Sequence, residues 1–97
     1  MREAASEMKK AVVTVLGLDR KGIIARVSTV LYEHNVNILD ITQTVLSGFF
    51  NMVMLVDVSA PECSFAELAE RLGALGEEMG LQIRIQRSEI FEAMYQI

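Results

Sequence analysis

The sequence predicts an α+β fold: a four-stranded, antiparallel-type sheet with two helices on one face. The first observation is the order of elements, because apolar spacing along the 97 residues switches between that of strands and that of helices, giving strand, helix, strand, strand, helix, strand. The second is that the first and third strands are apolar on both faces, whereas the other two alternate. With right-handed crossovers, this order gives a ferredoxin-like βαββαβ sandwich whose first and third strands are central.

The first strand and helix lie on either side of a polar turn. Residues 11–16 form a β-branched, nearly continuous apolar run that ends at Gly17. From Gly22 the spacing becomes helical, and Asn35 suits the left-handed residue that ends such a helix. The predicted buried stripe of this helix is Ile23, Ile24, Val27, Val30, Leu31 and His34.

A hairpin follows the first helix. Residues 36–47 alternate, which predicts a half-exposed strand near a sheet edge. Leu39, Ile41 and Val45 are expected on one face, and Asp40, Thr42 and Thr44 on the other. Ser47 and Gly48 form the predicted turn, and residues 49–59 are apolar on both faces, as expected for a central strand.

The second half of the chain supplies one helix and the last strand. After a loop at residues 60–63, Ser64 and Glu67 match the S-x-x-E capping box that opens a helix. Gly80 ends that helix, and residues 81–87 then alternate as an edge strand should. The predicted buried stripe of the helix is Phe65, Leu68, Leu72, Leu75 and Met79.

The domain division expected from these elements has three parts. Residues 1–10 are polar and form a flexible segment, residues 11–88 form the domain, and residues 89–97 form a helical tail packed on the domain or on a partner. Two helices cover only one face of a sheet. Apolar side chains on the other face of the central strands therefore need another cover, and a second copy of the chain is the simplest one.

Composition narrows the classes of function. The net charge of −4 argues against nucleic acid as the main partner, because phosphate binding needs a basic face. No apolar run approaches the roughly 20 residues that span a membrane. A single cysteine, Cys63, excludes a disulfide framework within the chain and suggests a reducing, cytoplasmic setting. No metal-ligand spacing is present, and neither a cofactor nor a catalytic group is expected.

The turn at residues 17–22, Gly-Leu-Asp-Arg-Lys-Gly, is the best candidate for a binding site. A helix that starts directly after a strand points its unpaired N–H groups and its positive dipole end at the turn. Two glycines allow the backbone to approach a small anionic group. Arg20 and Lys21 add positive charge, and Asp19 can hold an ammonium group. These groups together suit a zwitterion better than a phosphate.

The motif D-R-x-G-I, followed at this distance by N-I-x-D within βαββαβ, resembles an ACT domain over about residues 11–88. It is similar to the ACT modules of formyltetrahydrofolate hydrolases and glycine-cleavage repressors, and to small stand-alone ACT proteins. The resemblance implies a regulatory module, not an enzyme, that binds an amino acid or related metabolite at a homodimer interface. Any regulation would act through a protein partner or through the pairing. The ligand-binding residues that it implies are Leu18, Asp19, Arg20, Gly22 and Ile23 in the turn, and Asn37 and Ile38 in the second strand. Lys21 departs from the proline that many ACT modules have there.

Other functions remain open at the level of sequence. The chain could be an interaction protein that acts through its dimer or a partner and binds no small molecule. It could be an acylphosphatase-like hydrolase if Arg20 and Asn37 converged on one anion, although the glycine-rich cradle is missing. Cys63 would need a nearby base to be a nucleophile, and His34 is more simply a helix-end residue. Met52, Met54 and Met79 are expected in the core.

Overall fold

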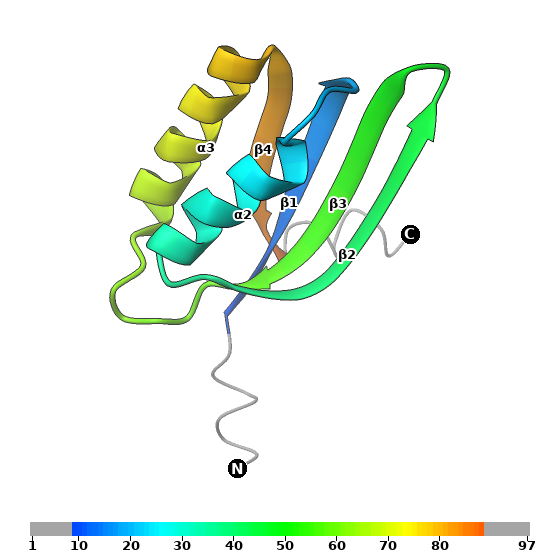
Figure 1. Cartoon of the computed structure of the whole chain (residues 1–97). Helices are drawn as coiled ribbons and strands as arrows, with labels where there is room; N and C mark the ends of the chain where they lie inside the picture. Colours follow the sequence, from blue (N-terminus) through cyan, green and yellow to red (C-terminus); the bar gives the residue numbers. More distant parts are fainter. Residues whose placement is uncertain (1–8, 89–97) are drawn as a thin grey trace.

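The structure of the protein, a computed structural model, describes residues 9–88 and contains the six predicted elements in the predicted order (Figure 1). Strand β1 leads into helix α2, strands β2 and β3 form a hairpin, and helix α3 leads into strand β4. Their bounds are β1 Lys10–Leu18, α2 Ile23–Glu33, β2 Asn37–Leu46, β3 Phe49–Asp57, α3 Phe65–Met79 and β4 Leu81–Arg87. The predicted C-terminal helix falls at residues 89–97, outside the described residues.

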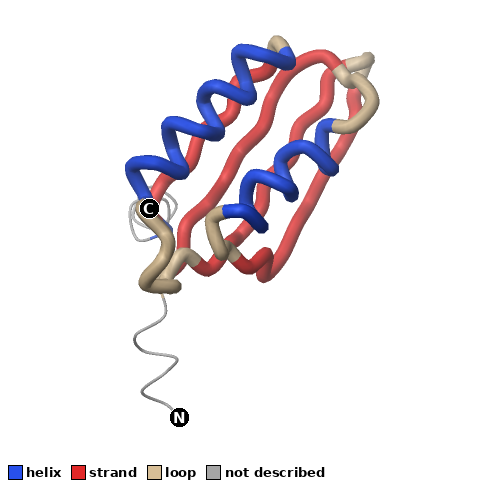
Figure 2. The backbone as a smooth tube through the Cα atoms, turned by 60° about the vertical axis from the view of Figure 1, so that its left-hand side comes forward, coloured by secondary structure: helices blue, strands red, loops and turns tan. Residues whose placement is uncertain are grey.

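The four strands form one antiparallel sheet in the order β2-β3-β1-β4. The two strands that are apolar on both faces are therefore the central ones, which confirms the prediction. Figure 2 shows α2 and α3 side by side on the same face of the sheet, and the other face is called the open face below. This arrangement is the ferredoxin-like sandwich that the element order predicts.

The core lies between the helices and the sheet. Alternate residues of β1 and β3 point toward the helices, and Val13, Val15, Met52 and Met54 are fully buried there. Leu68, Leu72 and Leu75 of α3 pack against them with no exposed surface. Met79 is 5% exposed, so all three methionines predicted for the core lie in it.

Helix ends form largely as the sequence indicates. The Ser64 hydroxyl accepts a hydrogen bond from the Glu67 N–H at 3.3 Å and caps α3. Asn35 and Gly80 adopt left-handed conformations, with φ of 60° and 71°, after α2 and α3. Two residues of the predicted stripe are not buried: Ile24 in α2 is 38% exposed, and His34, the C-cap residue, is half-buried.

Strand β2 differs most from its prediction. A bulge between Ile38 and Asp40 shifts the register, so the alternation of Leu39 with Ile41 and Val45 is interrupted. Ile38 and Ile41 pair with Val56 and Met54 and so both lie on the helix side. The strand is also more exposed than expected, with Ile41 and Val45 at 41% and 55%.

Candidate functional site

The turn between β1 and α2 sits beside the β2–β3 hairpin at one end of the sheet. Leu18, the last residue of β1, pairs with Phe49 at the start of β3. The next residue, Asp19, donates its N–H to the Gly48 carbonyl of the hairpin turn at 2.9 Å. This bond fixes the turn against the hairpin, and the start of α2 therefore faces the exposed end of β2.

An open groove of about 580 Å³ lies between the start of α2 and the hairpin. Its floor is largely apolar, with Phe50 only 5% exposed and Ile23 2% exposed. Its polar residues are Asp19, Arg20 and Gln43. The lining is Asp19, Arg20, Gly22, Ile23, Ile24, Ala25, Gln43, Val45 and Phe50.

The N-terminus of α2 opens onto this groove without a side-chain cap. Gly22 is the N-cap residue, with a φ of 83°, and it has no side chain to accept from the following N–H groups. The Arg26 N–H donates to the Gly22 carbonyl at 2.9 Å, so the three N–H groups before it have no partner four residues back in the helix. The first turn also contains no acidic residue. This end of α2 therefore presents free donors and a positive dipole to the groove, a combination that favours an anionic group.

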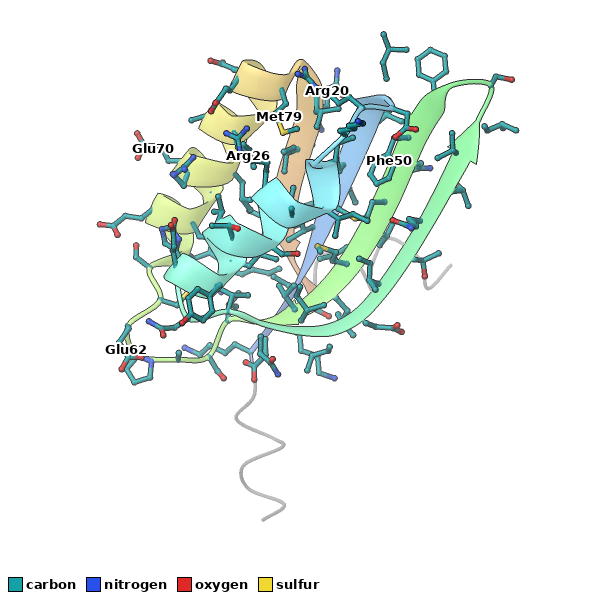
Figure 3. All side chains as sticks on the ribbon, viewed as in Figure 1. Arg20, Arg26, Phe50, Glu62, Glu70 and Met79 are labelled. Carbon is teal, nitrogen blue, oxygen red and sulfur yellow. The ribbon has the colours of Figure 1, made fainter. Side chains whose placement is uncertain are left out.

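Arg20 is held on the far side of the turn. Its Nη1 donates to the carbonyl oxygen of Met79, the last residue of α3, at 2.9 Å. Figure 3 shows Arg20 beside Met79 at the end of α3, with Phe50 on the β3 side. This bond ties the turn before α2 to a helix that ends 59 residues further along the chain.

The structure brings together only part of the predicted set of site residues. Asp19, Arg20, Gly22 and Ile23 all line the groove. Leu18 lies instead in a smaller hollow, described below. Asn37 and Ile38 lie at the opposite end of the sheet, because Asn37 shares the partner Asp57 with Lys10, the first residue of β1. Within one chain the seven residues do not form a single site.

The same separation bears on the hydrolase alternative. A phosphate cradle would require Arg20 and Asn37 beside one another, but within one chain they lie at opposite ends of the sheet. Arg20 is also bonded to the Met79 carbonyl. Arg20 and Asn37 of one chain therefore do not form the anion site that this chemistry needs.

Five groove residues were missed from the sequence: Ile24 and Ala25 follow the predicted turn residues directly, and the other three, Gln43, Val45 and Phe50, belong to the hairpin. The hairpin register brings them together, since Val45 pairs with Phe50 and Gln43 pairs with Met52 on the helix side of the sheet. The signal was present in the Ser47-Gly48 turn, where both residues have positive φ, because a two-residue turn fixes which residues face each other. Extending that register would have placed Gln43 and Val45 beside the start of α2.

A second hollow of about 350 Å³ lies at the same end of the sheet. Four of its residues, Leu16, Leu18, Phe49 and Gln82, fall on the open face by their register with one another. Leu16, Leu18 and Phe49 are 48%, 64% and 53% exposed. Gly17 and Gly80 complete the lining. The two hollows therefore lie at one end of the sheet, on either side of the turn after β1.

Outside the two hollows, the carboxyl of Glu78 and the thiol of Cys63 have shifted pKa values. Arg26 Nη2 forms an ion pair with Glu78 Oε2 at 2.8 Å, and this hydrogen bond lowers the pKa of the Glu78 carboxyl. Burial raises the pKa of the Cys63 thiol, which opposes the thiolate that a nucleophile requires. Among residues 9–88, no three of histidine, cysteine, aspartate and glutamate come together as a metal site. No helix in the same range is long and apolar enough to cross a membrane.

Comparison with known proteins supplies the family. A family model described as the ACT domain matches residues 9–86. A UPF0237 protein of Bifidobacterium longum is 50% identical over 90 residues, which is 93% of this chain and all of that protein. An ACT domain protein from Streptococcus pneumoniae is 39% identical, with a TM-score of 0.75 over 87% of this chain and 94% of that one.

The predicted likeness to modules of larger proteins is also found. A formyltetrahydrofolate deformylase from Pseudomonas syringae is 27% identical over 84% of this chain, with a TM-score of 0.74. The match covers 28% of the deformylase, so the likeness is to one module of that enzyme. ACT domains are regulatory ligand-binding modules that often bind amino acids and commonly dimerise. Over nearly its whole described length, this chain belongs to the ACT domain family.

Proposed function

We propose that the protein is a regulatory module that binds an amino acid or related metabolite in the groove, at an interface between two copies of the chain. The observation that carries the proposal is the uncapped N-terminus of α2, which opens onto a cavity of about 580 Å³. Free N–H groups at a helix N-terminus suit a carboxylate. The Asp19 carboxylate, in the same lining, suits an ammonium group.

The groove floor matches the rest of such a ligand. Ile23, Val45 and Phe50 offer apolar surface, and the side-chain amide of Gln43 can both donate and accept hydrogen bonds. A mainly apolar cavity with a few convergent polar groups is the usual form of a small-molecule site. The groove therefore favours a zwitterion with a small or medium apolar side chain.

The length and low charge of edge strand β2 support a dimer formed at this edge of the sheet. Strand β2 is an edge strand of ten residues, and Asp40 is its only charged residue. The other edge, β4, is shorter and carries Arg84 and Arg87. A long edge with few charges is suited to pairing with another strand, whereas charged side chains discourage it. We therefore place the interface at β2.

Pairing at β2 also accounts for Asn37 and Ile38. If two β2 strands meet antiparallel about a two-fold axis near Thr42, the first residues of one strand lie beside the last residues of the other. Val45, near the end of β2, lines the groove. Asn37 and Ile38 from the second copy would then approach the groove of the first, and the predicted set of site residues would be completed across the interface.

The ligand proposal is tested by thermal unfolding of the purified protein with each free L-amino acid. A ligand at about 100 times its Kd adds roughly 2.7 kcal/mol to the free energy of unfolding. For a domain of this size, the expected rise in Tm is on the order of 10 °C or more. Asp19→Asn should abolish the rise for a selective ligand. A flat panel would contradict amino-acid binding and favour an interaction protein with an empty groove.

The dimer proposal is tested separately by sedimentation velocity. Thr42→Lys places like charges near the proposed two-fold axis, where they repel each other across the paired strands. Gln86→Lys adds the same charge to the β4 edge and serves as the matched control. We expect the first variant to sediment as a monomer and the second to behave as wild type. Loss of the dimer in Gln86→Lys alone would move the interface to β4.

A further inference from the structure

We infer that Arg20 is a latch shared between the groove and the end of α3: it holds the Met79 carbonyl when the groove is empty and turns to the carboxylate of a ligand when the groove is filled. This inference rests on the ligand site proposed above and adds a route by which occupancy alters the rest of the domain. Arg20 would then select ligands that carry a carboxylate and would also link the groove to α3.

The end of α3 depends on cations from outside the helix. Its last turn contains Glu77 and Glu78 but no basic residue, although a helix C-terminus is the negative end of the dipole. Two arginines supply the missing positive charge. Arg20 bonds the Met79 carbonyl at 2.9 Å, and Arg26 pairs with Glu78 at 2.8 Å. Both come from the turn before α2 or from α2 itself, so these contacts join the two helices at this end.

Of these two arginines, only Arg20 also lines the groove. Its side chain is exposed, and its present partner is a neutral carbonyl. A carboxylate accepts two parallel N–H bonds from one guanidinium, and such charge-assisted pairs are about twice as strong as neutral ones. An anionic ligand bound at the start of α2 therefore competes directly with Met79 for Arg20.

Release of Arg20 acts on a tightly packed junction. Met79 is followed by Gly80, whose N–H bonds the Gly76 carbonyl, and β4 starts at Leu81. Gly80 also lines the hollow on the other side of the turn, next to Leu18 and Phe49. Loss of the Arg20 bond loosens this junction, and a change in the groove is thereby transmitted to the open-face side of the sheet.

The test uses sodium acetate, which carries the carboxylate alone, against sodium chloride at equal ionic strength. Amide NMR of the full chain reports binding at Ile23–Ala25, and hydrogen exchange of the Gly80 amide reports the junction. In the wild type, we expect acetate to shift the α2 amides and to speed Gly80 exchange. In Arg20→Gln, Gly80 should exchange about tenfold faster without acetate, as expected when one hydrogen bond to a charged group is lost, and should not respond to it.

Arg26→Gln is the matched control, because it removes the other arginine that contacts the end of α3. It should leave the response of Gly80 to acetate intact. The inference is overturned if acetate leaves Gly80 unchanged in the wild type, if Arg20→Gln responds as the wild type does, or if the α2 amides do not shift. A flat amino-acid panel with the acetate response present would reject the proposed ligand class and support the latch. An amino-acid ligand whose affinity and effect on Gly80 are unchanged by Arg20→Gln would support the proposed ligand class and reject the latch.

Discussion

Two glycines of α3, three residues apart, give opposite predictions for the same substitution. In a helix interior, glycine is about 1 kcal/mol less favourable than alanine. A Cβ added at Gly73 meets nothing within 4 Å. A Cβ added at Gly76 would lie 2.7 Å from the Leu81 carbonyl oxygen and 3.3 Å from Ile83 Cγ1. The difference between the two variants therefore isolates the close contact between α3 and β4.

The magnitudes follow from these contacts. Gly73→Ala should stabilise the domain by about 1 kcal/mol, which raises Tm by roughly 4–8 °C. Gly76→Ala has the same propensity gain, but the backbone oxygen it meets cannot move without displacing β4, and such overpacking costs about 1–3 kcal/mol. Because the propensity term is common to both, Gly76→Ala should be less stable than Gly73→Ala by about 1–3 kcal/mol.

Thermal and urea unfolding of both variants measure this difference. The slope of the urea transition should match the wild type in each case, since neither substitution changes the surface exposed on unfolding by much. Equal stabilisation of the two variants would refute the close packing of α3 on the start of β4. That packing is also what makes the Arg20 latch effective, because a loose junction could not be changed by one hydrogen bond.

Three further predictions concern single positions. Gly22→Ala should destabilise the domain by about 1 kcal/mol in thermal unfolding, because a left-handed residue is strained with a side chain even where the added Cβ meets nothing. Glu78→Gln should make stability depend less on pH in acid. The Arg26 hydrogen bond lowers the pKa of Glu78 in the folded protein, so the contribution of Glu78 to stability is present above about pH 4.3 and disappears as pH falls through the lower folded value. Urea midpoints at pH 3–7 would measure this difference. Cys63, whose thiol pKa is raised by burial, should react with a disulfide reagent at pH 8 more slowly than free cysteine does, and a faster reaction would contradict its packing.

The sequence predicted the fold well because each of its signals was local and mutually consistent. The change of spacing at Gly22, the Ser64 cap and the glycine at position 80 each define a boundary that the structure reproduces. The central position of β1 and β3 followed from their apolar character on both faces. The bulge near Leu39 was not predicted, since the alternating pattern of β2 gives no sign of an extra residue.

The candidate site was predicted less completely, for a physical reason. Asp19, Arg20, Gly22 and Ile23 are close in sequence and fall together in the groove, whereas Leu18 lies in the smaller hollow. Gln43 and Phe50 enter it only through the hairpin register. The bond from Arg20 to Met79 joins residues 59 positions apart, and no local pattern indicates where a long side chain will find a distant carbonyl.

In the dimer proposed above, the second copy would bridge the separation between Asn37 and the turn within one chain. Two-fold pairing of an antiparallel edge strand always brings its first residues beside the last residues of its copy. Here those last residues border the groove, and the strand concerned is the long edge with one charge. A ligand between the copies would then contact the turn of one chain and the start of β2 of the other. Its binding would stabilise the dimer by mass action, and dimerisation would in turn raise the affinity for ligand by the same factor. Thr42→Lys should therefore weaken both dimerisation and ligand binding. Arg20→Gln should weaken ligand binding and leave dimerisation of the ligand-free protein unchanged.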